Sequence, residues 1–199
     1  SLKGYVEHID NFRFDLATQE LYEFTWEKLC DWYIEFCKIR LNDRSISGTK
    51  KNQIKNSLLD IFENTLKLAH PMMPFITEEI WQSFRETFST KEKSIMVSDL
   101  PTKYSGVSNL LNIETLRSVI SGIRNIRAEM VISPKKDITV IVEKNKSFKK
   151  LLDQNENYLF YLTRVKSIEF LNNNIPPSAI LLVEGTKIHI PLQGCLLYT

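Results

Sequence analysis

The spacing of the apolar residues changes once along this chain, and that change limits the folds it can adopt. Through residue 133 the apolar residues recur every three or four positions, as on one face of a helix. Directly afterwards Ile138, Val140 and Val142 alternate with the period of a strand. The sequence therefore predicts a mainly α protein, with a helical bundle over residues 1–133 and a small α/β (β-α-β-β) subdomain over residues 134–199.

The first long helix is predicted to run from Asp15, a good N-cap residue, to about Arg40. Five acidic residues along it step by three or four positions and so form one narrow stripe. They are Glu20, Glu23, Glu27, Asp31 and Glu35. Most other positions carry large apolar or aromatic side chains. A helix that is apolar over most of its circumference is expected to be buried among several neighbours, at the centre of the bundle.

Three further helices are predicted before the period changes. They are expected at about 50–69, 74–84 and 109–130. His70-Pro71 should end the first of them, because proline cannot continue the helical hydrogen-bond ladder, and Pro74 suits a first turn. A loop at 87–108, with a short extended piece near 95–97, should separate the other two. The last helix should turn these residues inward: Ile113, Leu116, Val119, Ile120, Ile123 and Met130.

The remaining elements belong to the predicted α/β subdomain. One helix is expected at 147–163, followed by strands at about 167–171, 179–184 and 187–191. Glu184-Gly185 should form the turn between the last two strands. A unit of about 65 residues buries little apolar surface by itself, so we expect it to pack on the helix that precedes it.

The composition is that of an ordinary globular protein, with 43% hydrophobic residues, 25% charged residues and a net charge of +2. No apolar run approaches the roughly 18 residues of a membrane span, so we expect a cytoplasmic protein without a membrane partner. Cys30 and Cys37 lie on one predicted helix about 10 Å apart, which is too far for a disulfide. They are expected to be small core residues, and Cys195 stands alone.

Enzyme signatures do not account for this chain. It contains no GxGxxG, GxxxxGK[ST], GxSxG or HExxH pattern. His8, His70 and His189 fall in three different predicted elements, without a Cys, His or acid at metal-ligand spacing. Glu78-Glu79 opens a helix, where the helix dipole favours acids, and this explains the pair better than acid/base chemistry. No catalytic residue, metal site or cofactor is therefore predicted within the chain.

Basic residues are the better candidates for a binding site. Arg117, Arg124 and Arg127 fall within about a quarter turn of one another on the last bundle helix, opposite its apolar face. Lys135 and Lys136 continue the positive charge beyond that helix. Because guanidinium groups suit phosphate, these five residues are predicted contacts to a nucleic-acid backbone. A solvated helix face explains the three arginines equally well.

Two other sets of residues could also contact RNA. Residues 38–55 hold six basic residues against Asp43 alone. The aromatic residues of the first helix, among them Tyr22 and Trp26, could stack on bases, but at helical spacing they are expected in the core. The acidic stripe of that helix suggests that RNA approaches elsewhere.

Several longer segments resemble one family. They are FRFDLA at 12–17, LYEFTW at 21–26, DWYIE at 31–35, HPMMPFITEEIW at 70–81 and IRNIRAEM at 123–130. In this order they are similar to the anticodon-binding helical domain of valyl-tRNA synthetases. The segment at 70–81 resembles the leucyl, isoleucyl and methionyl relatives as well and so marks the class I group. The DWY element, and IRNIRAEM with Ile132-Ser133-Pro134 after it, resemble the valyl members in particular.

The resemblance implies a helical bundle of the class I synthetase anticodon-binding type. It also implies a parent enzyme, a valine–tRNA ligase, that charges tRNA(Val) with valine using ATP and magnesium, and that is cytoplasmic and monomeric. Signatures like HIGH and KMSKS do not occur here, so the catalytic and editing domains are expected in the rest of a parent chain. This segment would then supply binding energy through the anticodon arm of the tRNA.

Two departures from the family leave an alternative open. The family's bundle begins with further helices before the position of Leu2, and its small subdomain precedes a coiled-coil arm that has no counterpart in this sequence. The alternative is a structural helical bundle with little RNA affinity until it joins those helices, which would dimerise or aggregate through bare apolar faces. A stand-alone hydrolase has no nucleophile–base pair to support it.

Overall fold

The computed structural model describes residues 2–88, 92–101, 110–143, 145–171 and 176–192, without the side chains of residues 110 and 111. It divides into two compact units, residues 1–106 and residues 107–199. Cys30 and Cys37 are free, as predicted. The prediction for Cys195, and the predicted helix start at residue 109, lie outside the described residues.

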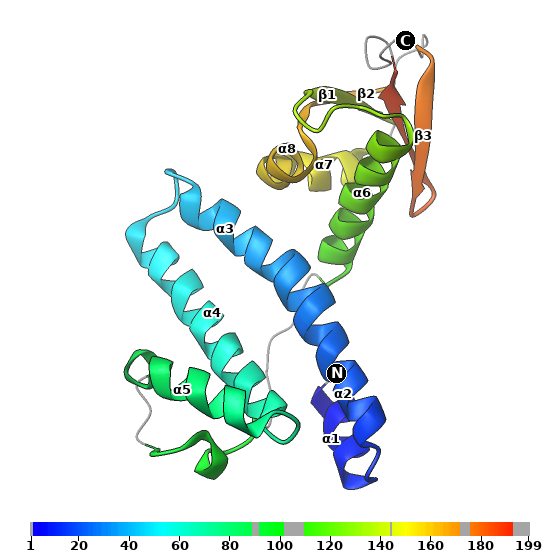
Figure 1. Ribbon diagram of the computed structural model, residues 1–199. Coiled ribbons are helices and arrows are strands. Elements are labelled where there is room, and N and C mark those ends of the chain that lie inside the picture. Colours follow the sequence, from blue (N-terminus) through cyan, green and yellow to red (C-terminus); the bar gives the residue numbers. More distant parts are fainter. Residues whose placement is uncertain (1, 89–91, 102–109, 144, 172–175, 193–199) are drawn as a thin grey trace. The chain divides into compact units, whose positions relative to one another are not determined.

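The first unit opens with a helical hairpin of α1 (Leu2–Asp10) and α2 (Phe14–Glu23), drawn in blue in Figure 1. Phe12 has a positive φ of 56° in the connection, where the chain reverses. Tyr5 on α1 is buried against α2, and its hydroxyl donates a hydrogen bond to the carbonyl of Leu68 at 2.6 Å. The hairpin is therefore tied to a later helix of the same unit.

The helix continues beyond α2 through a π-helical segment (Phe24–Ile34) into α3 (Glu35–Asn42). In π-helical geometry each N–H bonds to the carbonyl five residues earlier, so a stripe spaced for an α-helix loses its alignment. The prediction of one regular α-helix is wrong for this segment. The prediction of burial on all sides is also wrong within this chain, because Tyr22 is 61% exposed and Trp26 is 58% exposed.

The next helix, α4 (Gly48–Ala69), forms the second arm of a hairpin with α3 (Figure 1). The Ser47 hydroxyl caps it by accepting a hydrogen bond from the N–H of Lys50. α5 (Pro74–Phe88) then follows, so the predicted stop at His70-Pro71 and start at Pro74 are confirmed.

A second core of the first unit surrounds Trp81 on α5, which is fully buried with Leu66 and Ile95. Ile95–Val97 is a short 3-10 helix, so the predicted extended piece is wrong. The Glu78 carboxylate accepts hydrogen bonds from the Ser94 hydroxyl at 2.9 Å and from the N–H of Ile95 at 3.0 Å. Glu78 therefore fixes this segment on α5, a structural role in line with the sequence analysis.

The second unit is a four-stranded sheet with helices packed on it. Its elements are α6 (Leu110–Glu129), β1 (Ile138–Val142), α7 (Lys146–Gln154), α8 (Glu156–Thr163), β2 (Val165–Phe170), β3 (Ser178–Val183) and β4 (Thr186–Pro191). The strand order is β2-β1-β4-β3, with β1 and β2 parallel and the other neighbours antiparallel. The four predicted strands are confirmed, so the described part of this unit has one strand more than the formula β-α-β-β gives. The predicted single helix at 147–163 is wrong, because Asn155 leaves helical geometry and divides it.

The turn between β3 and β4 is the one predicted at Glu184-Gly185. Both residues have positive φ, 47° and 75°, as a two-residue hairpin turn of this type requires. The Thr115 hydroxyl on α6 donates a hydrogen bond to the Glu184 carboxylate, so α6 is held to this turn.

Close packing also joins α6 to the sheet. A Cβ atom added at Gly122 would overlap the side chain of Leu181 on β3. Ile120 and Ile123 are fully buried on the same helix, as predicted, whereas Ile113 is 47% exposed and its predicted burial is wrong. α6 thus packs on the α/β part, as the sequence analysis expected. The compact units divide between residues 106 and 107, while the periodicity changes at residue 133.

Candidate functional site

The three arginines predicted to share the solvent face of α6 have different surroundings. Arg117 is half-buried, Arg124 is exposed, and Arg127 is only 7% exposed. A solvated helix face, which the sequence allowed for all three, does not describe Arg127. The burial of a charged guanidinium requires hydrogen-bond partners close by.

Backbone carbonyl groups supply those partners. The guanidinium of Arg127 donates to the carbonyl of Thr163 at 3.1 Å, to that of Lys136 at 2.8 Å and to that of Ser133. The carbonyls of Ser133 and Lys136 come close to Arg127 because the chain turns back just after α6, where Val131 has a φ of 51°. Arginine fits here because its planar fork carries five donors. Arg127 therefore joins the end of α6, the start of β1 and the end of α8.

Arg124 and Arg164 lie close to Arg127 and the carbonyl groups that it binds. Arg124 donates from Nε to the carbonyl of Leu162 at 3.1 Å. Arg164 ends α8 in a left-handed conformation, with a φ of 58°, and its guanidinium carbon lies 5.4 Å from the centre of the Phe160 ring. Both residues line a pocket of about 420 Å³ in the second unit, together with Arg127 and Tyr161. None of the described residues that line this pocket is acidic.

The other predicted site residues lie near the pocket or farther along α6. Lys135 is exposed and Lys136 half-buried, and both directly follow Pro134, which lines the pocket. Arg117 is not among the residues lining it and precedes Arg124 by seven positions, about two turns of helix. The structure therefore brings Arg124 and Arg127 together, places the two lysines beside them, and leaves Arg117 apart.

Arg164 and Tyr161 were not predicted from the sequence. Neither belongs to a periodic basic pattern, because Arg164 is a single residue between α8 and β2, and Tyr161 stands among the apolar residues of α8. The only available signal was the isolated arginine at a predicted helix end. Its proximity to Arg124 comes from the packing of α8 on α6.

The alternative basic segment at 38–55 surrounds the connection between α3 and α4 in the first unit. Arg40, Arg44, Lys50 and Lys55 are exposed there. Lys38 is 2.6 Å from the Glu35 carboxylate, which partly offsets its charge. The segment is a basic surface of exposed side chains.

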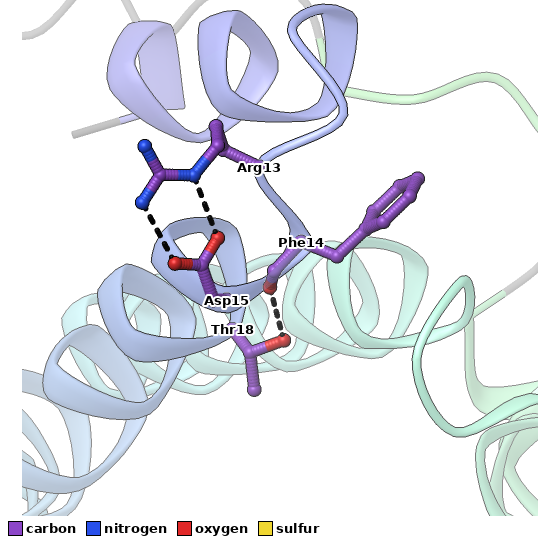
Figure 2. Close-up of polar contacts among 4 residues, drawn as sticks. All are labelled: Arg13, Phe14, Asp15 and Thr18. Carbon is purple, nitrogen blue, oxygen red and sulfur yellow. Dashed lines mark hydrogen bonds and ion pairs between the residues drawn. The ribbon is translucent and has the colours of Figure 1, made fainter.

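The segment with the FRFDLA motif has a local polar arrangement, shown in Figure 2. Arg13 donates to both carboxylate oxygens of Asp15, at 3.0 and 2.8 Å, and the Thr18 hydroxyl donates to the carbonyl of Phe14 at 2.7 Å. The hydrogen bond from Arg13 lowers the pKa of Asp15 to about 2. The prediction that Asp15 caps the helix is wrong, because α2 begins at Phe14 and Arg13 occupies the cap position.

A second hollow lies in the first unit, between α1, α2 and α4. It measures about 400 Å³, and Tyr5, Leu21, Phe24 and Leu68 are among its mostly apolar lining residues. The described residues include no group of three or more His, Cys, Asp and Glu side chains that could hold a metal ion. None of the described helices has the length and apolar character needed to cross a membrane.

In chain order, a helical unit is followed by an α/β unit whose described residues form an arginine-lined pocket without acidic lining residues. The family model described as the anticodon-binding domain of tRNA ligase matches residues 2–142 of this chain. This chain belongs to that family, as the sequence motifs predicted. The match covers the first unit and continues through α6 to the end of β1.

Two curated relatives extend the comparison over nearly the whole chain. The protein named valine–tRNA ligase of Francisella tularensis subsp. tularensis (strain SCHU S4 / Schu 4) is 38% identical over 194 residues, which cover 94% of this chain and 21% of that protein. The protein named valine–tRNA ligase of Coxiella burnetii (strain RSA 493 / Nine Mile phase I) is 39% identical over 202 residues, which cover 98% of this chain and 22% of that protein. The chain thus spans about a fifth of the length of these relatives.

Proposed function

We propose that this chain is the tRNA-binding part of a valine–tRNA ligase, a larger enzyme that joins valine to tRNA(Val) with ATP and magnesium. The observation that carries this proposal is its likeness to two valine–tRNA ligases over 94% and 98% of its length, together with the anticodon-binding family match. The catalytic and editing chemistry belongs to the other domains of that enzyme, which is monomeric and cytoplasmic.

The tRNA backbone contacts are Arg117, Arg124, Lys135 and Lys136, with Arg127 acting as a positioning residue. The exposed charge of Arg124 and Lys135 beside an acid-free pocket supports this assignment. Arg127 acts through the three carbonyl groups that it holds, because these fix the connection that carries both lysines.

The test is the binding of this chain to tRNA(Val) and to an unrelated tRNA across a salt series. A triple variant, Arg124→Ala with Lys135→Ala and Lys136→Ala, should weaken binding at least about tenfold and flatten its salt dependence. The matched control removes three charges from the α3–α4 connection, with Arg44→Ala, Lys50→Ala and Lys51→Ala. We expect this control to bind nearly as well as the unmodified chain. If the control variant loses more tRNA affinity than the first triple variant, the binding site lies at the α3–α4 connection.

One observation favours the second candidate function, a structural bundle with little RNA affinity of its own. The first unit exposes Tyr22 and Trp26 and contains the apolar hollow of about 400 Å³. This candidate predicts self-association, because apolar surfaces of this kind attract partners. Sedimentation of the chain with and without tRNA separates the two candidates. Concentration-dependent dimers without a tRNA complex would overturn the tRNA-binding proposal.

A further inference from the structure

The pocket at the ends of α6 and α8 has a size and a chemistry that the backbone contacts alone do not explain. Its volume of about 420 Å³ falls within the roughly 300–1,000 Å³ of pockets that hold small organic ligands. A surface that only screened phosphate charge would not need a hollow of this size. The size of the pocket therefore suits a ligand that has a sizeable organic group in addition to a charged group.

Its charge points to an anion. Arg124 and Arg164 are exposed arginines of the pocket lining, one from α6 and one from the end of α8. The buried Arg127, which donates to backbone carbonyl groups, adds a third arginine to the lining. Guanidinium groups bind phosphate oxygens through paired donors, so a phosphate is the anion that these arginines suit best.

Its aromatic residue points to a base. Tyr161 is 61% exposed although it lies on α8 beside the pocket, and it stands edge-on to Phe160 with ring centres 5.6 Å apart and planes at 79°. An exposed aromatic residue alone is common on protein surfaces. Next to two arginines, however, it offers the kind of stacking platform that proteins use for unpaired bases.

We infer that this pocket binds one unstacked nucleotide of the RNA, with its phosphate at Arg124 and Arg164 and its base on Tyr161. The base must come from a single-stranded loop or end, because a base within a duplex has both faces covered. The inference rests on the proposed function and adds Tyr161 and Arg164 to the binding surface. It assigns the two residues different roles, since stacking is insensitive to salt and phosphate binding is not.

The experiment measures the affinity of the full chain for labelled tRNA(Val) across a salt series. Tyr161→Ala should weaken binding about 5- to 150-fold with an unchanged salt slope, because one stacked base contributes about 1–3 kcal/mol. Tyr161→Phe should bind nearly as the unmodified chain does, because it keeps the ring. Arg164→Asn, which suits the left-handed backbone, should weaken binding and lower the slope by about 0.7 for one lost contact to single-stranded phosphate.

Matched controls keep the result specific. Tyr22→Ala removes a tyrosine that is also 61% exposed but lies in the first unit, and Lys166→Ala removes an exposed charge elsewhere in the second unit. Tyr22→Ala should not weaken binding as Tyr161→Ala does, and Lys166→Ala should not lower the salt slope as Arg164→Asn does. If Tyr161→Ala is folded and binds like the unmodified chain at every salt concentration, the nucleotide pocket is overturned while tRNA binding stands. If the unmodified chain binds no tRNA, the proposed function itself fails.

Discussion

The long helix of the first unit and α6 of the second unit both have apolar residues at helical spacing. They differ in how far those residues are buried by contacts with other elements. The long helix, from α2 through the π-helical segment to α3, leaves Tyr22 and Trp26 mostly exposed. α6 is fixed by Gly122 against Leu181 and by the hydrogen bonds of Arg127 to three carbonyl groups. The difference shows that a pattern states which side chains favour burial, while a specific partner decides whether they are buried.

Within the second unit, the largest expected effect comes from removing the guanidinium of Arg127. Arg127→Ala leaves three carbonyl groups without their donor and should lower the free energy of unfolding of the second unit by about 3 kcal/mol. All three tryptophans lie in the first unit, at positions 26, 32 and 81. In urea, circular dichroism should therefore show an early transition that tryptophan fluorescence does not follow.

Arg127→Lys is the control for charge. It keeps the positive charge but replaces the planar fork with a single ammonium group, so it should recover only part of the stability. Full recovery by lysine would mean that charge, and not the fork, holds the end of α6. Coincident transitions by both probes would mean that the two units unfold as one.

A smaller effect tests the contact between α6 and β3. Gly122→Ala should lower the free energy of unfolding by about 1 kcal/mol, because the added methyl group overlaps Leu181. In a Leu181→Ala background the same change should stabilise by up to about 1 kcal/mol, since alanine favours a helix over glycine. The measurement is a double-mutant cycle by urea unfolding. If Gly122→Ala raises the free energy of unfolding in both backgrounds, the contact with Leu181 does not require glycine at position 122.

The long helix should tolerate changes that α6 does not. Trp26→Gln is expected to change the free energy of unfolding by only about 0.5 kcal/mol, because the indole is 58% exposed and its stacking on Tyr22 is solvated. Trp81→Ala is the matched comparison, and it should cost about 3–5 kcal/mol because Trp81 is fully buried. Chemical unfolding measures both. A large loss from Trp26→Gln would mean that the long helix is held by its aromatic surface after all.

The smallest effect concerns the exposed pair at the start of α2. Arg13→Ala should raise the pKa of Asp15 from about 2 toward its ordinary value, because the hydrogen bond from Arg13 is the main cause of the lowered pKa. A pKa below that of the unfolded chain favours the fold above about pH 4, and this contribution fades as the pH falls toward 2. NMR titration of the Asp15 carboxyl group checks the shift. An unchanged midpoint would assign the low pKa to the backbone N–H groups of Asp15 and Leu16.

The sequence alone determined which segments form helices and strands, because periodicity and proline positions act locally. The period of 2 at Ile138–Val142, the stop at His70-Pro71 and the turn at Glu184-Gly185 all depend on residues within a few positions. The family motifs were readable for the same reason. The π-helical geometry and the break at Asn155 were not predicted, since the local pattern fits a regular helix as well.

Only the tertiary structure decided which of the basic residues lie together. Arg127 matched Arg124 in helical spacing, yet one is buried among carbonyl groups and the other is exposed on a pocket wall. Arg164 and Tyr161 join Arg124 because α8 packs on α6, nearly forty residues away in sequence. The sequence determines local conformation and composition, but burial and proximity depend on contacts between distant segments, which no local pattern specifies.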